Sequence, residues 1–165
     1  MFFRTEIIKK ILRNRKKLET KLKVKIQAKE SRIELEGDEL NTYIAEKVFD
    51  ALDSNFSLNI ALLLAEEEYL LEDIPIKRLT NKNLKTVRAR IIGTKGKTLK
   101  LLSELSDCYL TLHDNTISII GSAEKIKETE NALKSLILGS KQSNVFKYLE
   151  KHRKKPIIND LGIKE

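Results

Sequence analysis

The sequence has little of several features that mark particular classes of protein. Its 165 residues include one cysteine, Cys108, so no internal disulfide can form. No apolar run approaches the roughly 20 residues that cross a bilayer, and Met1-Phe2-Phe3 leads straight into charged residues, unlike a secretory signal. No spacing of residues suits a metal site. These absences predict a cytoplasmic protein that has no membrane partner and needs no metal or cofactor.

Catalytic groups are equally scarce. The two histidines, His113 and His152, fall in an expected strand end and a basic tail, without a nucleophile beside them in sequence. Cys108 falls in an alternating strand pattern, which favours a buried small hydrophobic side chain over a reactive thiol. We therefore do not expect an enzyme.

The charges that are present are sorted along the chain. The net charge is +8, and 41% of residues are apolar, as in folded domains. Residues 1–29 carry eleven Lys or Arg against two acids, residues 77–100 carry nine Lys or Arg and no acid, and residues 36–73 carry eleven acids and one base, Lys47. One basic segment is often only a solvated face. Two of them at matching places of a repeat favour contact with nucleic acid.

Apolar periodicity predicts that the first half runs helix, turn, helix, hairpin, helix. The expected elements are helices at 6–12, 17–22 and 41–52, a basic turn at 13–16, and strands through Val24, Ile26 and Ala28 and through Ile33 and Leu35, joined at Glu30-Ser31. Ser57 is then expected to cap a short apolar helix at 58–65, which connects the two halves.

The second half repeats this order about eighty residues later, with 12–16 matching 92–96 and Gly37 matching Gly121. It is preceded by an extended segment at 69–78, in which Pro75 argues for an edge strand or a strand end. The remaining expected elements are helices at 84–92 and 98–106, strands at 108–113 and 117–119, a helix after Gly121-Ser122, a loop at 139–143 and a helix at 144–153. The basic run at 151–155 either meets phosphates or stays in water, and residues beyond Pro156 are expected to be loosely held.

The loop at 93–97, between the helices expected at 84–92 and 98–106, is predicted to hold a phosphodiester. Gly93 and Gly96 allow unusual φ values and place no Cβ between the backbone and a sugar-phosphate chain. The following helix points its first N–H groups at the loop, and its dipole attracts an anion. Lys95 and Lys97 add positive charge.

The loop has two competing interpretations. Gly96-Lys97-Thr98 is the ending of a Walker A loop, but that motif needs a glycine where this chain has Ile91, and it follows a strand rather than a helix. A purely structural interpretation has Gly93 cap one helix and Gly96 turn into the next. The spacing alone is a weak signal, and its strength depends on the surroundings.

The order strand, helix, Gly-x-x-Gly, helix, strand, strand, helix is that of the KH domain, whose loop clamps about four nucleotides of single-stranded RNA or DNA. The sequence resembles the archaeal two-KH proteins of the Pno/Dim ribosome-assembly family, relatives of the Krr proteins. The resemblance lies in Arg90-Ile91-Ile92-Gly93-Thr94-Lys95-Gly96-Lys97-Thr98, in Ile119-Ile120-Gly121, and in Leu136-Ile137-Leu138-Gly139-Ser140 followed by Val145-Phe146-Lys147-Tyr148-Leu149. It is strong over nearly the whole second half and is one of pattern only in the first.

The resemblance implies an α+β fold of two tandem type I KH domains, at 1–66 and 67–165. Each would be a small three-stranded antiparallel sheet packed on helices, with an extra C-terminal helix. It also implies a non-catalytic protein that binds the 3′ region of pre-16S rRNA during small-subunit maturation. The implied partners are the Nob endonuclease and the alpha subunit of initiation factor two. The family's loop positions carry over to Gly93, Thr94, Lys95 and Gly96, flanked by Arg90, Lys97 and Thr98.

In the mechanism that we expect, the RNA backbone runs over residues 93–96 and is held by N–H groups, Arg90, Lys95 and Lys97. Bases turn inward against Ile92 and Leu110. Because aromatic residues make up only 5% of the chain, base stacking should matter less than in RRM proteins.

The first half departs from the family pattern. Arg13 and Lys16 stand where relatives commonly keep glycines, so this half is not expected to clamp RNA in the usual way. We expect it either to bind RNA through charge alone or to serve mainly as a packing partner. The alternative function is a protein-interaction adaptor in translation or ribosome assembly with little direct RNA binding, whose acidic middle faces partner proteins.

Overall fold

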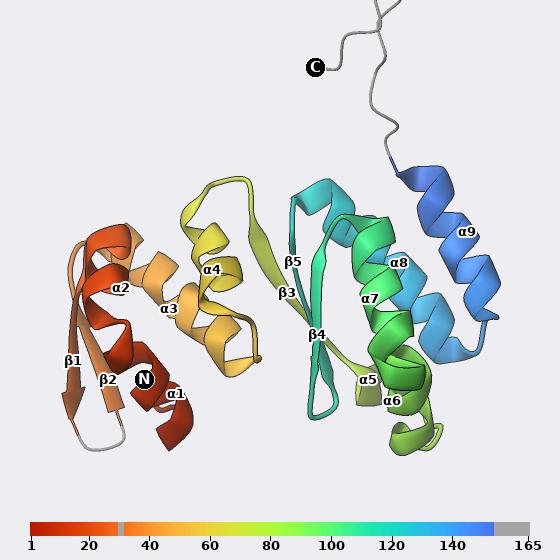
Figure 1. Cartoon of the computed structure of the whole chain (residues 1–165), viewed down its shortest axis with the longest axis horizontal. Helices are drawn as coiled ribbons and strands as arrows, with labels where there is room; N and C mark the ends of the chain where they lie inside the picture. Colours follow the sequence, from red (N-terminus) through yellow and green to blue (C-terminus); the bar gives the residue numbers. More distant parts are fainter. Residues whose placement is uncertain (30–31, 154–165) are drawn as a thin grey trace, which may run out of the picture.

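The computed structural model describes residues 1–29 and 32–153, which form two α+β halves lying side by side (Figure 1). The first half contains a helical pair, a β-hairpin and a long helix, and ends in a short connector. Its elements are α1 (Thr5–Arg13), α2 (Arg15–Leu22), β1 (Lys25–Lys29), β2 (Arg32–Glu36), α3 (Glu39–Asp53), α4 (Leu58–Ala61) and the 3₁₀ helix η1 (Leu62–Ala65).

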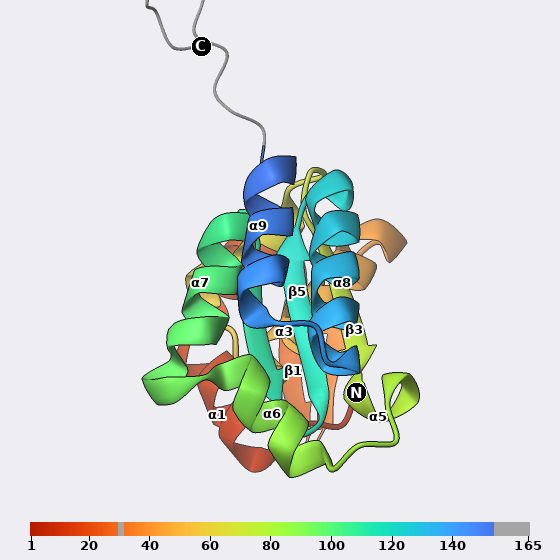
Figure 2. The ribbon, with the colours of Figure 1, turned by 90° about the vertical axis from the view of Figure 1, so that its right-hand side faces the viewer.

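The second half is a three-stranded antiparallel sheet of order β3-β5-β4, covered by helices on one face (Figure 2). The last helix, α9, packs on α7 and α8. The elements are β3 (Leu70–Pro75), α5 (Ile76–Leu79), α6 (Leu84–Ile92), the 3₁₀ turn η2 (Thr94–Gly96), α7 (Lys97–Ser106), β4 (Tyr109–His113), β5 (Thr116–Gly121), α8 (Ala123–Leu138) and α9 (Gln142–His152).

Local sequence signals explain most of these boundaries. The Asp38 carboxylate accepts from Asn41 N at 2.9 Å at the start of α3, and the Ser57 hydroxyl accepts from Ile60 N at 3.4 Å, which confirms the predicted cap of the connector. Pro75 is the last residue of β3, which lies at an edge of the sheet as expected.

The second face of the three-stranded sheet packs against the first half. Ile120 is fully buried in the hydrophobic cluster of the first half, whereas its neighbour Ile119 is buried in the cluster under the helices of the second half. The Thr111 hydroxyl on the same face as Ile120 donates to the Ser54 carbonyl at 2.8 Å. Successive strand residues point to opposite faces, so the central strand β5 is buried on both sides and joins the two cores.

Three details of the sequence prediction are wrong. The basic turn expected at 13–16 is a single residue, Asn14, because α1 continues through Arg13 and α2 begins at Arg15. The Asn14 side chain donates to Lys10 O at 2.8 Å, which satisfies a carbonyl at the helix end. Arg78 lies in the one-turn helix α5 rather than in an extended segment. The loop expected at 139–143 is shorter, since α9 already begins at Gln142.

The expected three-stranded sheet is also absent from the described part of the first half. There β1 pairs with β2 alone, as the predicted hairpin, with Ile26 opposite Leu35 and Ala28 opposite Ile33. The residues before α1 meet β2 at one isolated bridge, Phe2 to Arg32, supported by Ile33 N donating to Met1 O at 2.9 Å. Because α1 begins at Thr5, this pairing does not extend into a strand.

Some sequence predictions fall on residues outside the described ranges. These are the hairpin turn at Glu30-Ser31, the end of the basic run at Lys154-Lys155, and the loosely held segment beyond Pro156. Among the described helices, none is both long enough and apolar enough to cross a membrane.

Cys108 is the small buried side chain that the alternating pattern predicts. It is 3% exposed, and burial raises the pKa of its thiol. The Thr129 hydroxyl lies 3.4 Å from the sulfur. Gly121 on β5 lies directly opposite, where an added Cβ would come within 2.6 Å of Cys108 Sγ. The Cys108 sulfur therefore occupies the space that a side chain at residue 121 would need.

Gly121→Ala is expected to lower the free energy of unfolding by about 1–3 kcal/mol, through overpacking against the sulfur. In a Cys108→Ala background the nearest side-chain atom is Cβ at 3.4 Å, so most of that loss should disappear. Urea unfolding of the two single variants and the double variant measures this coupling. Equal losses in both backgrounds would show that the contact with sulfur is not the cause.

Candidate nucleic-acid interface

The loop that connects α6 to α7 is an open turn of four residues, Gly93, Thr94, Lys95 and Gly96. At the matching place in the first half, Asn14 alone separates α1 from α2. Three of the four loop residues, Gly93, Lys95 and Gly96, have positive φ. None of residues 13–16 does, so the basic junction of the first half has no comparable turn.

Gly93 gives the loop its shape. Its φ of +72° with ψ of −179° falls in a region that is essentially reserved for glycine. A Cβ at this position would lie 2.1 Å from Thr98 Oγ1 and 2.9 Å from Thr98 N. The end of α6 therefore closes directly onto the first turn of α7, and only glycine permits that approach.

Gly96 has a different role. Its φ is +75° in the left-handed region, and an added Cβ would meet nothing within 4 Å. Thr94, Lys95 and Lys97 beside it are exposed. The outer side of the turn thus presents backbone without a covering side chain, flanked by two lysines. This arrangement suits close approach of a sugar-phosphate chain.

The N–H groups of the turn are partly used inside it. Gly96 N donates to Gly93 O at 3.3 Å, and Lys97 N donates to Thr94 O. The sequence analysis expected these N–H groups to face a ligand. Two of them instead bond within the turn, so that expectation is wrong for Gly96 N and Lys97 N. Attraction of phosphate therefore depends more on Lys95 and Lys97, which lie in a segment, residues 77–100, that contains no acidic residue.

A residue that the sequence analysis missed, Gln142, links the two ends of the loop. Gln142, the first residue of α9, donates through Nε2 to Arg90 O at 3.1 Å and to Thr98 Oγ1 at 3.4 Å. The Arg90 guanidinium donates to the carbonyls of Gly139, at 3.4 Å, and Ser140. No local pattern reveals contacts between residues about fifty positions apart.

The predicted site residues thus separate into two groups. Thr98 is only 8% exposed and accepts from Gln142, and the Arg90 guanidinium is held by carbonyls of the loop before α9, so both hold the junction in place. Ile92 ends α6 and Leu110 lies on β4; both are half-buried, and Leu110 packs against the second hydrophobic cluster. The helix α7 contacts both α6 and β4. The residues on the outer surface are Thr94, Lys95, Gly96 and Lys97.

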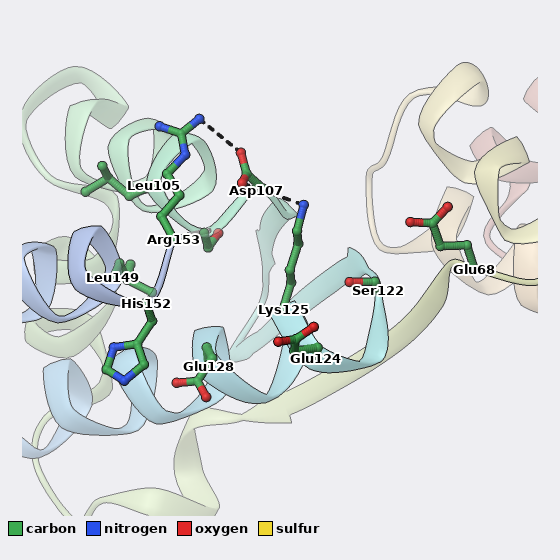
Figure 3. Close-up of a pocket in the computed structure, with 11 residues that line it drawn as sticks. Glu68, Leu105, Asp107, Ser122, Glu124, Lys125, Glu128, Leu149, His152 and Arg153 are labelled. Carbon is green, nitrogen blue, oxygen red and sulfur yellow. Dashed lines mark hydrogen bonds and ion pairs between the residues drawn. The ribbon is translucent and has the colours of Figure 1, made fainter. Parts of the chain in front are cut away.

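A separate hollow of about 290 Å³ lies where α7 ends, α8 begins and α9 ends (Figure 3). None of the predicted RNA-contacting residues lines it. Asp107 bridges Lys125 at 3.6 Å and Arg153 at 3.2 Å there, so its charges tie three helices together. The described residues contain no group of three or more His, Cys, Asp or Glu side chains that could hold a metal ion.

Together, these features define a class of protein. A strand, two helices joined by a Gly-x-x-Gly turn, two further strands and a helix, arranged on a sheet of order β3-β5-β4, form a type I KH domain.

Comparisons with known proteins agree with this class. The family model for the second KH domain of Pno1 proteins, described as eukaryotic type KH-domain (KH-domain type I), matches residues 70–154. The chain therefore belongs to the Pno1 family of KH proteins.

Relatives show how far the likeness extends. A KH domain-containing protein of Methanocaldococcus jannaschii is 28% identical over 120 residues, covering 72% of this chain and 53% of the relative. The pre-rRNA-processing protein PNO1 of Candida albicans is 30% identical over 135 residues, covering 76% and 49%. The chain thus spans about half the length of these curated relatives.

A solved structure is similar over a larger share of its length. The aDim2p chain in the a/eIF2alpha–aDim2p–rRNA complex from Pyrococcus horikoshii OT3 superposes with a TM-score of 0.82 at 26% identity, covering 92% of this chain and 91% of that one.

The two loop glycines are expected to differ in their effect on stability. Gly93→Ala should lower the free energy of unfolding by about 2–4 kcal/mol. The new Cβ would overlap the Thr98 side chain, and alanine does not adopt the φ and ψ angles of Gly93. Gly96→Ala should cost only about 1 kcal/mol, the price of a left-handed alanine. Urea unfolding of both variants tests this. Equal losses would mean that the contact between Gly93 and Thr98 does not hold the loop.

Proposed function

We propose that this chain binds single-stranded RNA through the Gly93–Gly96 turn and acts as an rRNA-processing factor in maturation of the small ribosomal subunit. The observation that carries the proposal is the exposed turn with its three positive-φ residues and no Cβ over Gly96. Support comes from a relative named a pre-rRNA-processing protein and from a similar chain solved in a complex with rRNA.

In this proposal the sugar-phosphate backbone passes over Gly96, and Lys95 and Lys97 neutralise its phosphates. Binding should weaken as salt rises, because these contacts release counterions. Bases then turn toward the half-buried side chains Ile92 and Leu110, where sequence preference would arise. Arg90 and Thr98 act indirectly, by holding the turn in place.

We further propose two tandem KH domains, residues 1–66 and 67–165, in an archaeal protein. Matching features 84 positions apart support the repeat. Lys23 and Asp107 are left-handed caps after the second helix of each half, and Gly37 corresponds to Gly121 before the third. In the first half, exposed Arg13, Arg15 and Lys16 would contact RNA through charge alone.

The finer assignments rest on family likeness. The proposed target is the 3′ region of pre-16S rRNA, and the proposed partners are the Nob endonuclease and the alpha subunit of initiation factor two. A similar chain has been solved with a/eIF2alpha. The proposed role is one of binding without catalysis. A protein-interaction adaptor with little RNA binding remains the second candidate, favoured by the acidic segment at 36–73.

Changing Thr94 and Lys95 together to Asp should separate the two functions. Both side chains are exposed, and Asp tolerates the left-handed conformation that Lys95 adopts, with φ of +54°. The fold should therefore persist while two carboxylates repel the phosphates. We expect affinity for a labelled oligonucleotide from the 3′ end of small-subunit rRNA to fall at least ~tenfold in fluorescence anisotropy, or ~1.4 kcal/mol.

Two controls sharpen this test. Thr94→Asn with Lys95→Asn removes the positive charge without adding negative charge, and should lose less affinity. Lys127→Asp with Lys147→Asp reverses two exposed charges on α8 and α9 and should lose the least. Full rRNA affinity in the Thr94→Asp, Lys95→Asp variant, with unchanged thermal unfolding, would reject the clamp. Lack of measurable rRNA affinity in the unaltered chain would favour the adaptor function.

A further inference from the structure

A groove of about 480 Å³ opens between α3 and the outer edge of β3, away from the RNA-binding loop. Leu40, Tyr43 and Ile44 of α3 form one wall, Leu64 of η1 forms the floor, and residues 69–72 form the other wall. We call this the α3–β3 groove. A second hollow, of about 960 Å³, shares Leu40 and Tyr43 with the groove, so these two side chains lie between the two hollows.

The groove exposes large apolar side chains that the fold does not use. Leu40 is 67% exposed, Tyr43 58% and Leu70 49%. Single exposed hydrophobic residues are common, but several grouped around one hollow mark an interaction site. Ile44, Tyr69 and Leu71 extend the apolar surface inward, where they pack against the core of the first half.

The rim of the groove is acidic. Glu66, Glu67 and Glu72 line it, and Asp38, Glu39 and Glu46 line the adjoining hollow. The one base on this surface, Lys47, lies over the Tyr43 ring at 5.5 Å from its centroid. An RNA backbone would be repelled here, whereas a basic segment would be attracted.

The outer edge of β3 offers main-chain hydrogen bonds as well. In the described part of the chain β3 pairs only with β5, so its other edge has no strand beside it. Side chains of successive strand residues point to opposite faces. Because consecutive residues 70, 71 and 72 all line the groove, it is the edge of the strand that faces it. An open edge of this kind binds extended peptides by adding a strand.

We propose that the α3–β3 groove binds an extended basic segment of a partner protein. The segment pairs with the edge of β3, places apolar side chains against Tyr43 and Leu40, and directs Lys or Arg toward Glu66, Glu67 and Glu72. Since β3 and β4 are opposite edges of the sheet, this site leaves the α6–α7 loop and β4 free. The protein can hold RNA and a protein segment at the same time.

Selection of random twelve-residue peptides on phage against the full chain tests the proposal. The enriched peptides should combine Lys or Arg with apolar residues, and synthetic copies should bind in fluorescence anisotropy. Leu40→Ser with Tyr43→Ser should weaken them at least ~tenfold. Glu66→Gln with Glu67→Gln should weaken them several-fold and reduce the dependence on salt, because the attraction at the rim is lost.

Leu138→Ser serves as the matched control, because Leu138 is similarly exposed, at 62%, but lies at the end of α8. It should leave peptide affinity unchanged. The proposal is overturned if no peptide is enriched over the Leu40→Ser, Tyr43→Ser variant, or if the enriched peptides are neutral or acidic. It is also overturned if that variant loses affinity for the single-stranded rRNA oligonucleotide, since the groove would then be part of the RNA path.

Discussion

The missing side chain at Gly93 sets the geometry of the whole interface. Because nothing separates the end of α6 from Thr98, the two helices meet at a turn short enough to project its outer residues into solvent. Gln142 and Arg90 then link this junction to α9 and to the loop before it. The helix α9 is thus part of the support of the loop, and in the proposed function it acts on RNA only through the loop.

The same sheet separates two kinds of surface. On the side of β4, α6 and α7 present lysines in a segment without acids, and on the side of β3 an acidic rim surrounds exposed apolar residues. The buried strand β5 lies between them and contributes Ile119 to one core and Ile120 to the other. The surface proposed for RNA and the surface proposed for a protein segment thus lie on opposite edges of one sheet and differ in charge.

Sequence periodicity predicted most of the elements because burial on one face leaves a regular trace, as in the hairpin of the first half and in the helix ending at Gly93. It failed where non-local contacts decide. The expected basic turn became the single residue Asn14, since without glycines the helices continue. The roles of Gln142 and Thr98 depend on contacts made in the folded structure. Gln142 bonds to residues 44 and 52 positions earlier, and Thr98 packs against Gly93, and residue spacing encodes neither contact. The exposed positions of the loop, Thr94, Lys95 and Lys97, could be identified because glycine spacing and charge are both local.

Amide chemical shifts during titration of ¹⁵N-labelled protein with a single-stranded rRNA oligonucleotide test the central claim most directly. If the Gly93–Gly96 turn binds the nucleic acid, the largest chemical-shift changes should occur at residues 94–97, followed by the side-chain amide of Gln142. The shifts of residues 40–47 should not change. Unchanged amide shifts at residues 94–97, with changes confined to the first half or to the α3–β3 groove, would contradict the account.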